Sequence, residues 1–526
     1  MILKERNYQY LVILIIAIYA FFINWISANV GAMPIDTFGF LDTGYSILKN
    51  KLPIRDFWIF TGITVDYLEA LFLLIFGNYW SSHVTHASII NIIASLSFYF
   101  FLNEINLKKS FSFFYSISFA TLCYPVSGTP FAYLHSYILS IILIFLLYVG
   151  IKNKSNLIWF IIPIISFLAF LSMQTPSAYI ILLVIFFSIY YFVKEKKIDN
   201  IKFAIFGSIT SLILFFLYLI ITNTPFKSFL YQYILFPLTI GEGRITSGNA
   251  AYVSLIDQLN FKTLIGNFKF IHIFFFPLII TTITIFIKKK KSDIKVLNLL
   301  IILSTLIFLF NQLVTANQIY IFSLIPILAS ILHLNILQQK YSPKLIFVIF
   351  IILIFATAKF HFRYNVDRKF HDLEKVNKSL ALNAELISKN LKNLKWITPH
   401  YKNPKEEIDV IKKALDVLEN DKRSKSLITH YQFFSTILDQ DLNIFNRWYL
   451  WDNNTHPTES HKYFNFYKNM VNENIEKNNI KVIYLLGSEK EILFVNVKNY
   501  FTDKCFKSTT LVKDKFSMHE IINCKK

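Results

Sequence analysis

The chain has 526 residues, of which 54% are hydrophobic and 16% are charged, and its mean hydropathy is +0.47. A soluble domain carries about 25% charged residues, so the composition excludes an ordinary soluble protein. The net charge of +20 raises the question of nucleic-acid binding. Most cations of the apolar part lie in short loops, where they set membrane topology, and no aromatic-basic RNA motif occurs. We therefore expect a protein of the lipid bilayer without a nucleic-acid partner.

Apolar runs of about 20 residues, long enough to cross a bilayer, recur up to about residue 360. The first run is long for a signal peptide and no small-residue cleavage site follows it, so we expect it to remain as a helix. The pattern predicts an all-α polytopic membrane bundle of about eleven transmembrane helices. Their predicted bounds are 10–28, 84–103, 111–126, 136–150, 157–172, 177–193, 203–222, 268–287, 296–315, 318–336 and 344–360.

The loop charges predict the orientation of this bundle. With the N-terminus inside, six short inner segments hold 17 of the 25 Lys and Arg residues that precede residue 361. This asymmetry is the positive-inside pattern, and an odd number of spans puts the C-terminal part outside. We expect a bacterial cytoplasmic (inner) membrane protein with a periplasmic C-terminal domain.

Two of the predicted outer loops are long: residues 29–83, here called the first loop, and residues 223–267, the second loop. The others are tight turns. The first loop contains the apolar stretch VDYLEALFLLIFG (65–77), which is too short to span a bilayer comfortably. Its Asp66 and Glu69 share one helix face at i, i+3. This stretch is typical of a helix that lies along the membrane surface.

Residues 361–526, here called the tail, are predicted to form a soluble α/β domain, because strand and helix patterns alternate. The expected helices are 376–391 and 406–420, and the expected strands are 424–431, 480–487 and 491–497. The spacing of Cys505 and Cys524 fits two strands closed by a disulfide, which would be stable only outside the cytoplasm. Gly487 is the only glycine of the tail, which argues against a nucleotide-binding loop.

The stretch PIDTFGFLDTGYSILKNKLPIRDFW (34–58) of the first loop carries Asp36, Asp42 and Asp56, with Arg55 beside the last. A membrane enzyme that faces outward has no access to ATP or nucleotide sugars, so its activated substrate would be carried on a lipid. Such an enzyme needs a carboxylate as general base for the acceptor. The three carboxylates are the candidates for this role, and Arg55 is a candidate substrate contact.

Cations of the second loop are candidates for holding the lipid phosphate, which would be the leaving group. Arg244 lies in the segment IGEGRITSGN, in a setting that suits phosphate binding, and Lys227 and Lys262 are weaker candidates that also fit a solvated surface. An apolar groove between nearby spans would hold the lipid tail.

Three further polar residues lie at the predicted outer ends of spans: His135, Gln174 and Gln318. They are candidate substrate contacts, although helix–helix hydrogen bonding would also explain such residues. His83 and His86 are spaced i, i+3, but a metal site needs more converging ligands. We expect no metal and no cofactor.

The order of these features resembles the first loop of GT-C glycosyltransferases, in the branch of the protein O-mannosyltransferases and aminoarabinose transferases. One span is followed by an early Asp, then by DTGYSILKNKLPIRDFW (42–58), and then by a short amphipathic helix that ends in Phe-Gly. The resemblance covers about residues 1–110 by motif and the rest by architecture. It implies that Asp36, 17 residues before Pro53, is the base, and that Asp56 matches a second acidic residue. Where the family often has Asp-Glu, this sequence has Asp36-Thr37.

We therefore expect a glycosyltransferase that uses a polyprenyl-phosphate sugar and a glycolipid, glycan or protein acceptor. A transporter of lipid-linked oligosaccharides is the first rival, but transporters place charges within their spans, and these spans are nearly free of them. A polysaccharide polymerase or ligase is the second rival, and an interaction protein without activity is the third. Asp42 remains open as a competing candidate for the base.

Overall fold

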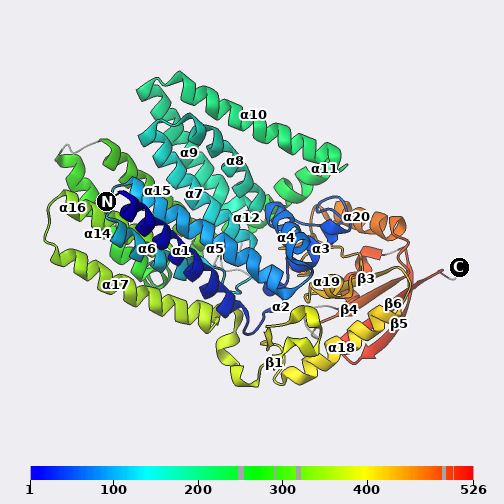
Figure 1. Cartoon of the computed structure of the whole chain (residues 1–526). Helices are drawn as coiled ribbons and strands as arrows, with labels where there is room; N and C mark the ends of the chain where they lie inside the picture. The colour runs from blue at the N-terminus through cyan, green and yellow to red at the C-terminus, as the bar shows by residue number, and fades with distance from the viewer. Residues whose placement is uncertain are drawn as a thin grey trace.

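The computed structural model describes residues 2–246, 254–288, 292–315, 321–487, 493–501 and 503–524. The long helices before the tail are α1 (Ile2–Ala28), α5 (Trp80–Glu104), α6 (Lys109–Cys123), α7 (Ala132–Asn153), α8 (Asn156–Ser172), α9 (Gln174–Glu195), α10 (Ile198–Ile221), α14 (Lys269–Ile287), α15 (Ser292–Thr315), α16 (Leu324–Gln338) and α17 (Lys344–Phe360). They form a bundle, and the tail lies at one end of it (Figure 1).

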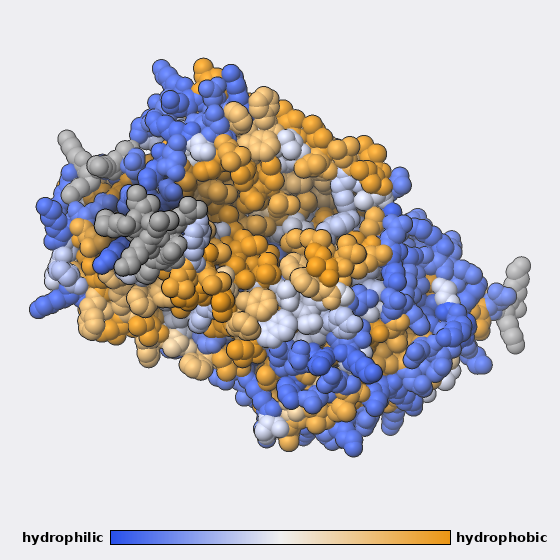
Figure 2. Space-filling view, viewed as in Figure 1, coloured by the Kyte–Doolittle hydropathy of each residue, from blue (hydrophilic) through white to orange (hydrophobic). Residues whose placement is uncertain are grey.

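Eight of the described helices are long and apolar enough to cross a membrane, namely α1, α5, α7, α9, α10, α14, α15 and α17. The chain is accordingly a multi-pass membrane protein. α8 and α16 are apolar but shorter, and α6 has 15 residues. Many large apolar side chains of the bundle are exposed, for example Leu214 and Phe216 of α10. Such a surface is unfavourable in water but suits contact with lipid. Figure 2 shows apolar residues gathered over the bundle and mostly hydrophilic residues over the tail.

The described residues of both long loops are largely helical. The first loop carries α2 (Pro34–Thr37), α3 (Leu41–Leu48) and α4 (Ile63–Phe76), and α4 coincides with the short amphipathic stretch predicted there. The second loop carries α11 (Phe226–Phe229), a π-helical turn over Leu230–Leu235, α12 (Phe236–Thr246), α13 (Leu255–Gln258) and a second π-helical turn over Lys262–Asn267.

The tail contains a four-stranded sheet in the order β3-β4-β6-β5. β3 (Lys425–Thr429) and β4 (Val482–Leu486) are parallel, whereas β6 (Phe516–Ile522) is antiparallel to β4 and to β5 (Cys505–Val512). The tail helices are α18 (Pro404–Asn420), α19 (Phe434–Leu438), α20 (Phe464–Lys477) and α21 (Phe494–Val497). Alternate residues of the two parallel strands face opposite sides: Leu427 packs in the cluster of α18, and Ile428 in that of α20.

Two element predictions for the tail are wrong. Residues 376–391 do not form a helix. They form short 3₁₀ turns and the strand β1 (Leu382–Asn383), which pairs with β2 (Lys395–Trp396). Here Asn377 and Ser388 accept hydrogen bonds from the backbone N–H groups of Ser379 and Asn390, and such local bonds compete with helix formation.

In the segment 491–497, the described residues form α21 and not a strand. The ring of Phe494 stacks on His519 of β6, with 3.7 Å between the ring centroids. β6 lies between β4 and the edge strand β5, which forms a hairpin with it. The disulfide between Cys505 and Cys524 closes this hairpin, as the cysteine spacing predicted.

Candidate active site

A cavity of about 140 Å³ lies where the first loop, the second loop and the tail meet. It is lined by Ile35, Asp36, Phe60, Thr61, Phe131, Ala132, Tyr133, Met173, Arg244, Trp448, Leu450, Asn454 and Thr455. The sequence-predicted base, Asp36, and the sequence-predicted phosphate ligand, Arg244, therefore share one cavity, although they are far apart in the sequence.

Asp36 lies in the first turn of α2, which begins with Pro34 after the extended residue Met33. Its side chain is 23% exposed, and its Oδ2 atom is 3.1 Å from Nε2 of His371, which is buried. Sequence reasoning missed His371. It follows the last apolar segment by eleven residues, and no local pattern connects it with Asp36, so only the folded chain reveals the pair.

Arg244 lies in the last turn of α12. The helix is held at its start, where the ring of Phe236 contacts Trp58 of the first loop, with 5.4 Å between the centroids. One turn later the Thr239 hydroxyl is 2.9 Å from Nε2 of His461 in the tail. α12 thus contacts both the first loop and the tail, and Arg244 in its last turn lines the cavity between them.

Asp42 has a different environment from Asp36, because it is fully buried against α19 of the tail. Its Oδ2 accepts the N–H of Ser435 at 3.1 Å, and its Oδ1 accepts the N–H and the hydroxyl of Thr436 at 2.9 and 2.7 Å. The carboxylate thus caps the N-terminus of that short helix. Burial raises the pKa of Asp42 to about 6, and the donors offset this only in part. Asp42 does not line the cavity.

Asp56 is also occupied by protein groups. It accepts the Leu52 N–H at 2.8 Å and forms ion pairs with Arg55 and with Lys477 of the tail. Burial acts to raise the pKa of Asp56, but these donors outweigh burial and the pKa is lowered. Arg55 also donates to the Thr222 carbonyl at the end of α10. Neither Asp56 nor Arg55 lines the cavity, and both bind the first loop to its surroundings.

Gln174, Lys227 and Lys262 lie outside the cavity lining. The Gln174 amide donates to the carbonyls of Phe60 and Tyr233, both at 2.7 Å, and so links the two long loops. Lys227 and Lys262 are exposed. Gln318 lies outside the residues that the structure describes.

His135 belongs to a buried polar chain beside the cavity. The two oxygens of Glu69 are each 2.8 Å from an Nδ1 atom, one of His83 and the other of His86. Nε2 of His86 is 3.1 Å from Nε2 of His135, whose Nδ1 contacts the carbonyl of Phe131. Burial raises the pKa of Glu69, but the two imidazoles outweigh burial and hold it below its usual range. This network explains the polar face of α4 and fixes α4 against α5 and α7.

The tail supplies one wall of the cavity through the segment that contains Arg447 and Trp448. Arg447 is buried, forms an ion pair with Asp66 of α4 and donates to the Thr61 carbonyl. The indole N–H of Trp448 donates to the Ile35 carbonyl at 2.8 Å. The sequence did not single out Arg447 as a site residue. Two signals for it were present: Arg447 lies in the aromatic run NRWYLW, and Asp66 is a carboxylate in an apolar stretch that needs a partner.

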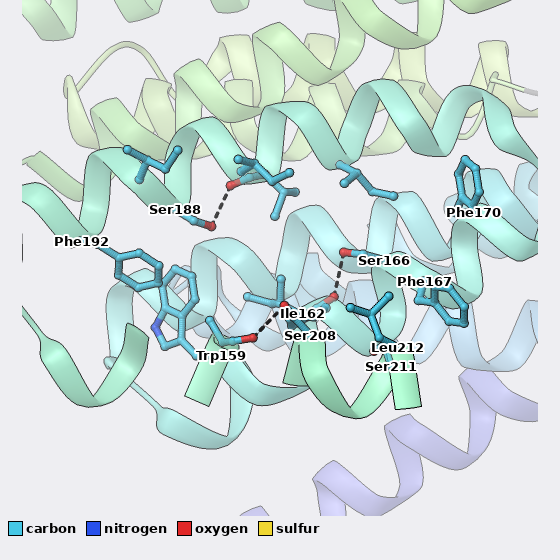
Figure 3. A pocket seen from close by; sticks show the side chains of 16 residues that line it. Trp159, Ile162, Ser166, Phe167, Phe170, Ser188, Phe192, Ser208, Ser211 and Leu212 are labelled. Atoms are coloured by element: carbon cyan, nitrogen blue, oxygen red, sulfur yellow. Dashed lines mark hydrogen bonds between the residues drawn. The ribbon is translucent and has the colours of Figure 1, made fainter. Parts of the chain in front are cut away.

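Two apolar grooves flank α8 in the bundle. The first, of about 500 Å³, lies between α8, α9 and α10. Figure 3 shows Trp159 and Phe192 at one end of it and Phe167 and Phe170 at the other. Its serines donate to carbonyls of their own helices, as Ser166 does to Ile162, so they leave the groove apolar. The second groove, of about 530 Å³, lies between α4, α8 and α10.

The first groove leads toward the cavity. Phe170 of α8 lines the groove, and Met173, three residues later, lines the cavity. Met173 directly follows Ser172, the last residue of α8, and has an extended backbone, so the end of the groove at Phe170 lies close along the chain to the cavity. From Trp159 to Phe170 the helix rises about 17 Å, a length suited to an extended lipid chain.

Among the residues that the structure describes, no group of three or more His, Cys, Asp or Glu side chains is placed to hold a metal ion. Comparison of the sequence with models of known protein families gives no match, and comparison with curated proteins gives none. The candidate site is therefore interpreted from its own geometry.

Breaking the buried ion pair should loosen the tail. We expect Asp66→Asn or Arg447→Met alone to lower the free energy of unfolding by about 3 kcal/mol, because each leaves a charge buried without its partner. The double variant should lose less than the sum of the two. Thermal unfolding of the purified full-length wild type, the two single variants and the double variant gives these losses. If the loss of the double variant equals the sum of the two single losses, the two residues are not coupled.

Replacing Asp42 tests its capping role. Asparagine offers one acceptor oxygen to three donors and places an NH₂ group against a backbone N–H. We expect Asp42→Asn to lower stability by about 1–3 kcal/mol and to increase hydrogen exchange in α19. Unchanged exchange at Ser435 and Thr436 would contradict this role.

Proposed function

We propose that this chain is a membrane glycosyltransferase of the outer face of a bacterial cytoplasmic membrane. It transfers a sugar from a polyprenyl-phosphate carrier to a glycolipid, glycan or protein acceptor. The observation that carries the proposal is that Asp36 and Arg244 line one cavity, toward which an apolar groove leads. A base, a cation for a phosphate and a lipid groove are the parts that such a transfer needs.

The proposed topology adds α6, α8 and α16 to the eight longer apolar helices, which gives eleven spans. With the N-terminus inside, as the loop charges favour, the cavity and the tail face the outer side. The resemblance of the first loop to the GT-C branch of protein O-mannosyltransferases and aminoarabinose transferases supports the same arrangement.

In the proposed reaction, Asp36 takes the proton of an acceptor hydroxyl or amine while that group attacks the anomeric carbon of the donor sugar. The bond between this carbon and the phosphate oxygen breaks, and the oxygen keeps the electron pair. Arg244 stabilises the charge that develops on the leaving phosphate. A single displacement inverts the anomeric configuration. Asp42 and Asp56 keep the first loop in place for this step.

The groove between α8, α9 and α10 is proposed to hold the polyprenyl chain. Its lining is almost entirely apolar, and it lies among helices whose apolar side chains are exposed. A chain bound along α8 directs its phosphate toward Met173 and hence toward the cavity that contains Arg244. The lipid thus enters from the bilayer without crossing the polar tail.

Removing the base should abolish transfer. We expect Asp36→Asn to lower the transfer rate at least about 100-fold, and Arg244→Met to lower it roughly tenfold or more. The measurement uses purified protein in lipid nanodiscs with radiolabelled polyprenyl-phosphate hexoses and pentoses and a cell-envelope extract as acceptor. Lys227→Met, on the same loop as Arg244 but exposed and outside the cavity, is the matched control and should retain full transfer.

Two results would contradict the proposal. One is wild-type protein that transfers no sugar from any of these donors. The other is an Asp36→Asn variant with unchanged transfer.

A further inference from the structure

We propose that His371 is the positioning residue of Asp36: its Nε2–H holds one carboxylate oxygen so that the other faces the acceptor. This inference rests on the proposed function, because it assigns a role within the same site. It is carried by the contact between His371 Nε2 and Asp36 Oδ2, at 3.1 Å, and by the burial of the ring, which is 2% exposed.

The chain that follows α17 is fastened to the start of the first loop by several contacts. The Asn365 carbonyl accepts the hydroxyl of Ser27 at 2.7 Å, and the buried guanidinium of Arg368 donates to the carbonyls of Ser27 and Gly31. Three residues after Arg368, His371 meets Asp36. This segment, residues 365–371, acts as a strap beside the site.

The backbone of the strap is bent to make this contact. Arg368 and Asp372, on either side of the 3₁₀ turn Lys369–His371, have φ values of 51° and 56°, a left-handed conformation that costs energy for residues other than glycine. Such strain persists where surrounding contacts enforce it and is common at functional sites.

The hydrogen bonds assign the protonation of His371. Asp36 Oδ2 is an acceptor, so Nε2 carries a hydrogen. Nδ1 is buried and has no partner among the described atoms. A buried N–H without an acceptor is costly, and a charged imidazole would need acceptors at both nitrogens. These contacts favour the tautomer of His371 with its hydrogen on Nε2 and a lone pair on Nδ1.

This arrangement fixes the orientation of the general base. The Asp36 side chain is partly exposed, and among the described residues His371 is the one whose side chain bonds its carboxylate. With Oδ2 occupied, Oδ1 is the oxygen that takes the proton of the acceptor. Precise placement of the reacting groups contributes strongly to rate, so loss of the contact should lower kcat more than it raises KM.

The test compares His371→Gln with His371→Leu. Glutamine keeps an N–H donor near the place of Nε2, whereas leucine has a similar size and no donor. We expect the glutamine variant to keep kcat within about threefold and the leucine variant to lose about 10- to 100-fold, with little change in KM. Lys369→Ala is the control and should behave as wild type, because Lys369 lies in the same 3₁₀ turn but pairs with Glu374.

A second readout does not depend on transfer. In ¹⁵N NMR spectra of the full-length protein labelled at histidine, His371 should show a protonated Nε2 and an unprotonated Nδ1. The opposite tautomer would overturn the proposal, and so would a leucine variant as active as the glutamine variant. If the wild-type protein transfers no sugar, the proposed function is wrong. If the wild type is active and Asp36→Asn is inactive, but His371→Leu is as active as the wild type, the proposed function stands and only the role of His371 is wrong.

Discussion

The buried ion pair between Arg447 and Asp66 is the contact on which the rest of the site depends. A paired charge in a protein interior offsets its lost hydration only with good geometry and further hydrogen bonds, and Thr43 and the Thr61 carbonyl supply these. The next residue of the tail, Trp448, lines the cavity and bonds to the carbonyl beside Asp36. The candidate site is thus a product of two parts of the chain: without the docked tail, the cavity would lack a wall.

The same docking separates the three carboxylates of residues 34–58. Asp42 caps a helix of the tail, and Asp56 binds a lysine of the tail and an arginine of its own loop. Asp36 is the one of the three that lines the cavity. The three aspartates have the same side chain, but only the carboxylate of Asp36 faces the cavity, where a substrate could reach it. This difference, rather than the spacing of the three residues, favours Asp36 as the base.

Much of the fold could be predicted from sequence because hydrophobic periodicity is local. Each of the eleven predicted spans overlaps a helix, and the cysteine spacing anticipated the hairpin that the disulfide closes. Residues 376–391 show the limit: their apolar spacing is helical, but asparagine and serine side chains bond the backbone and favour tight turns. The pairing of Asp36 with His371 could not be predicted, because 335 positions separate them and only tertiary packing brings them together.

α8 lies beside an apolar environment in the bundle and ends near the polar environment of the cavity. An apolar groove runs beside this helix, and Met173, the residue that follows it, lines a cavity with a carboxylate and a guanidinium. The most direct test of the proposed function is a structure of the full chain with a polyprenyl phosphate bound. The lipid chain should lie along α8, between α9 and α10, with the phosphate within hydrogen-bonding distance of Arg244. A phosphate bound at the opposite end of the bundle, away from Asp36 and Arg244, would contradict it.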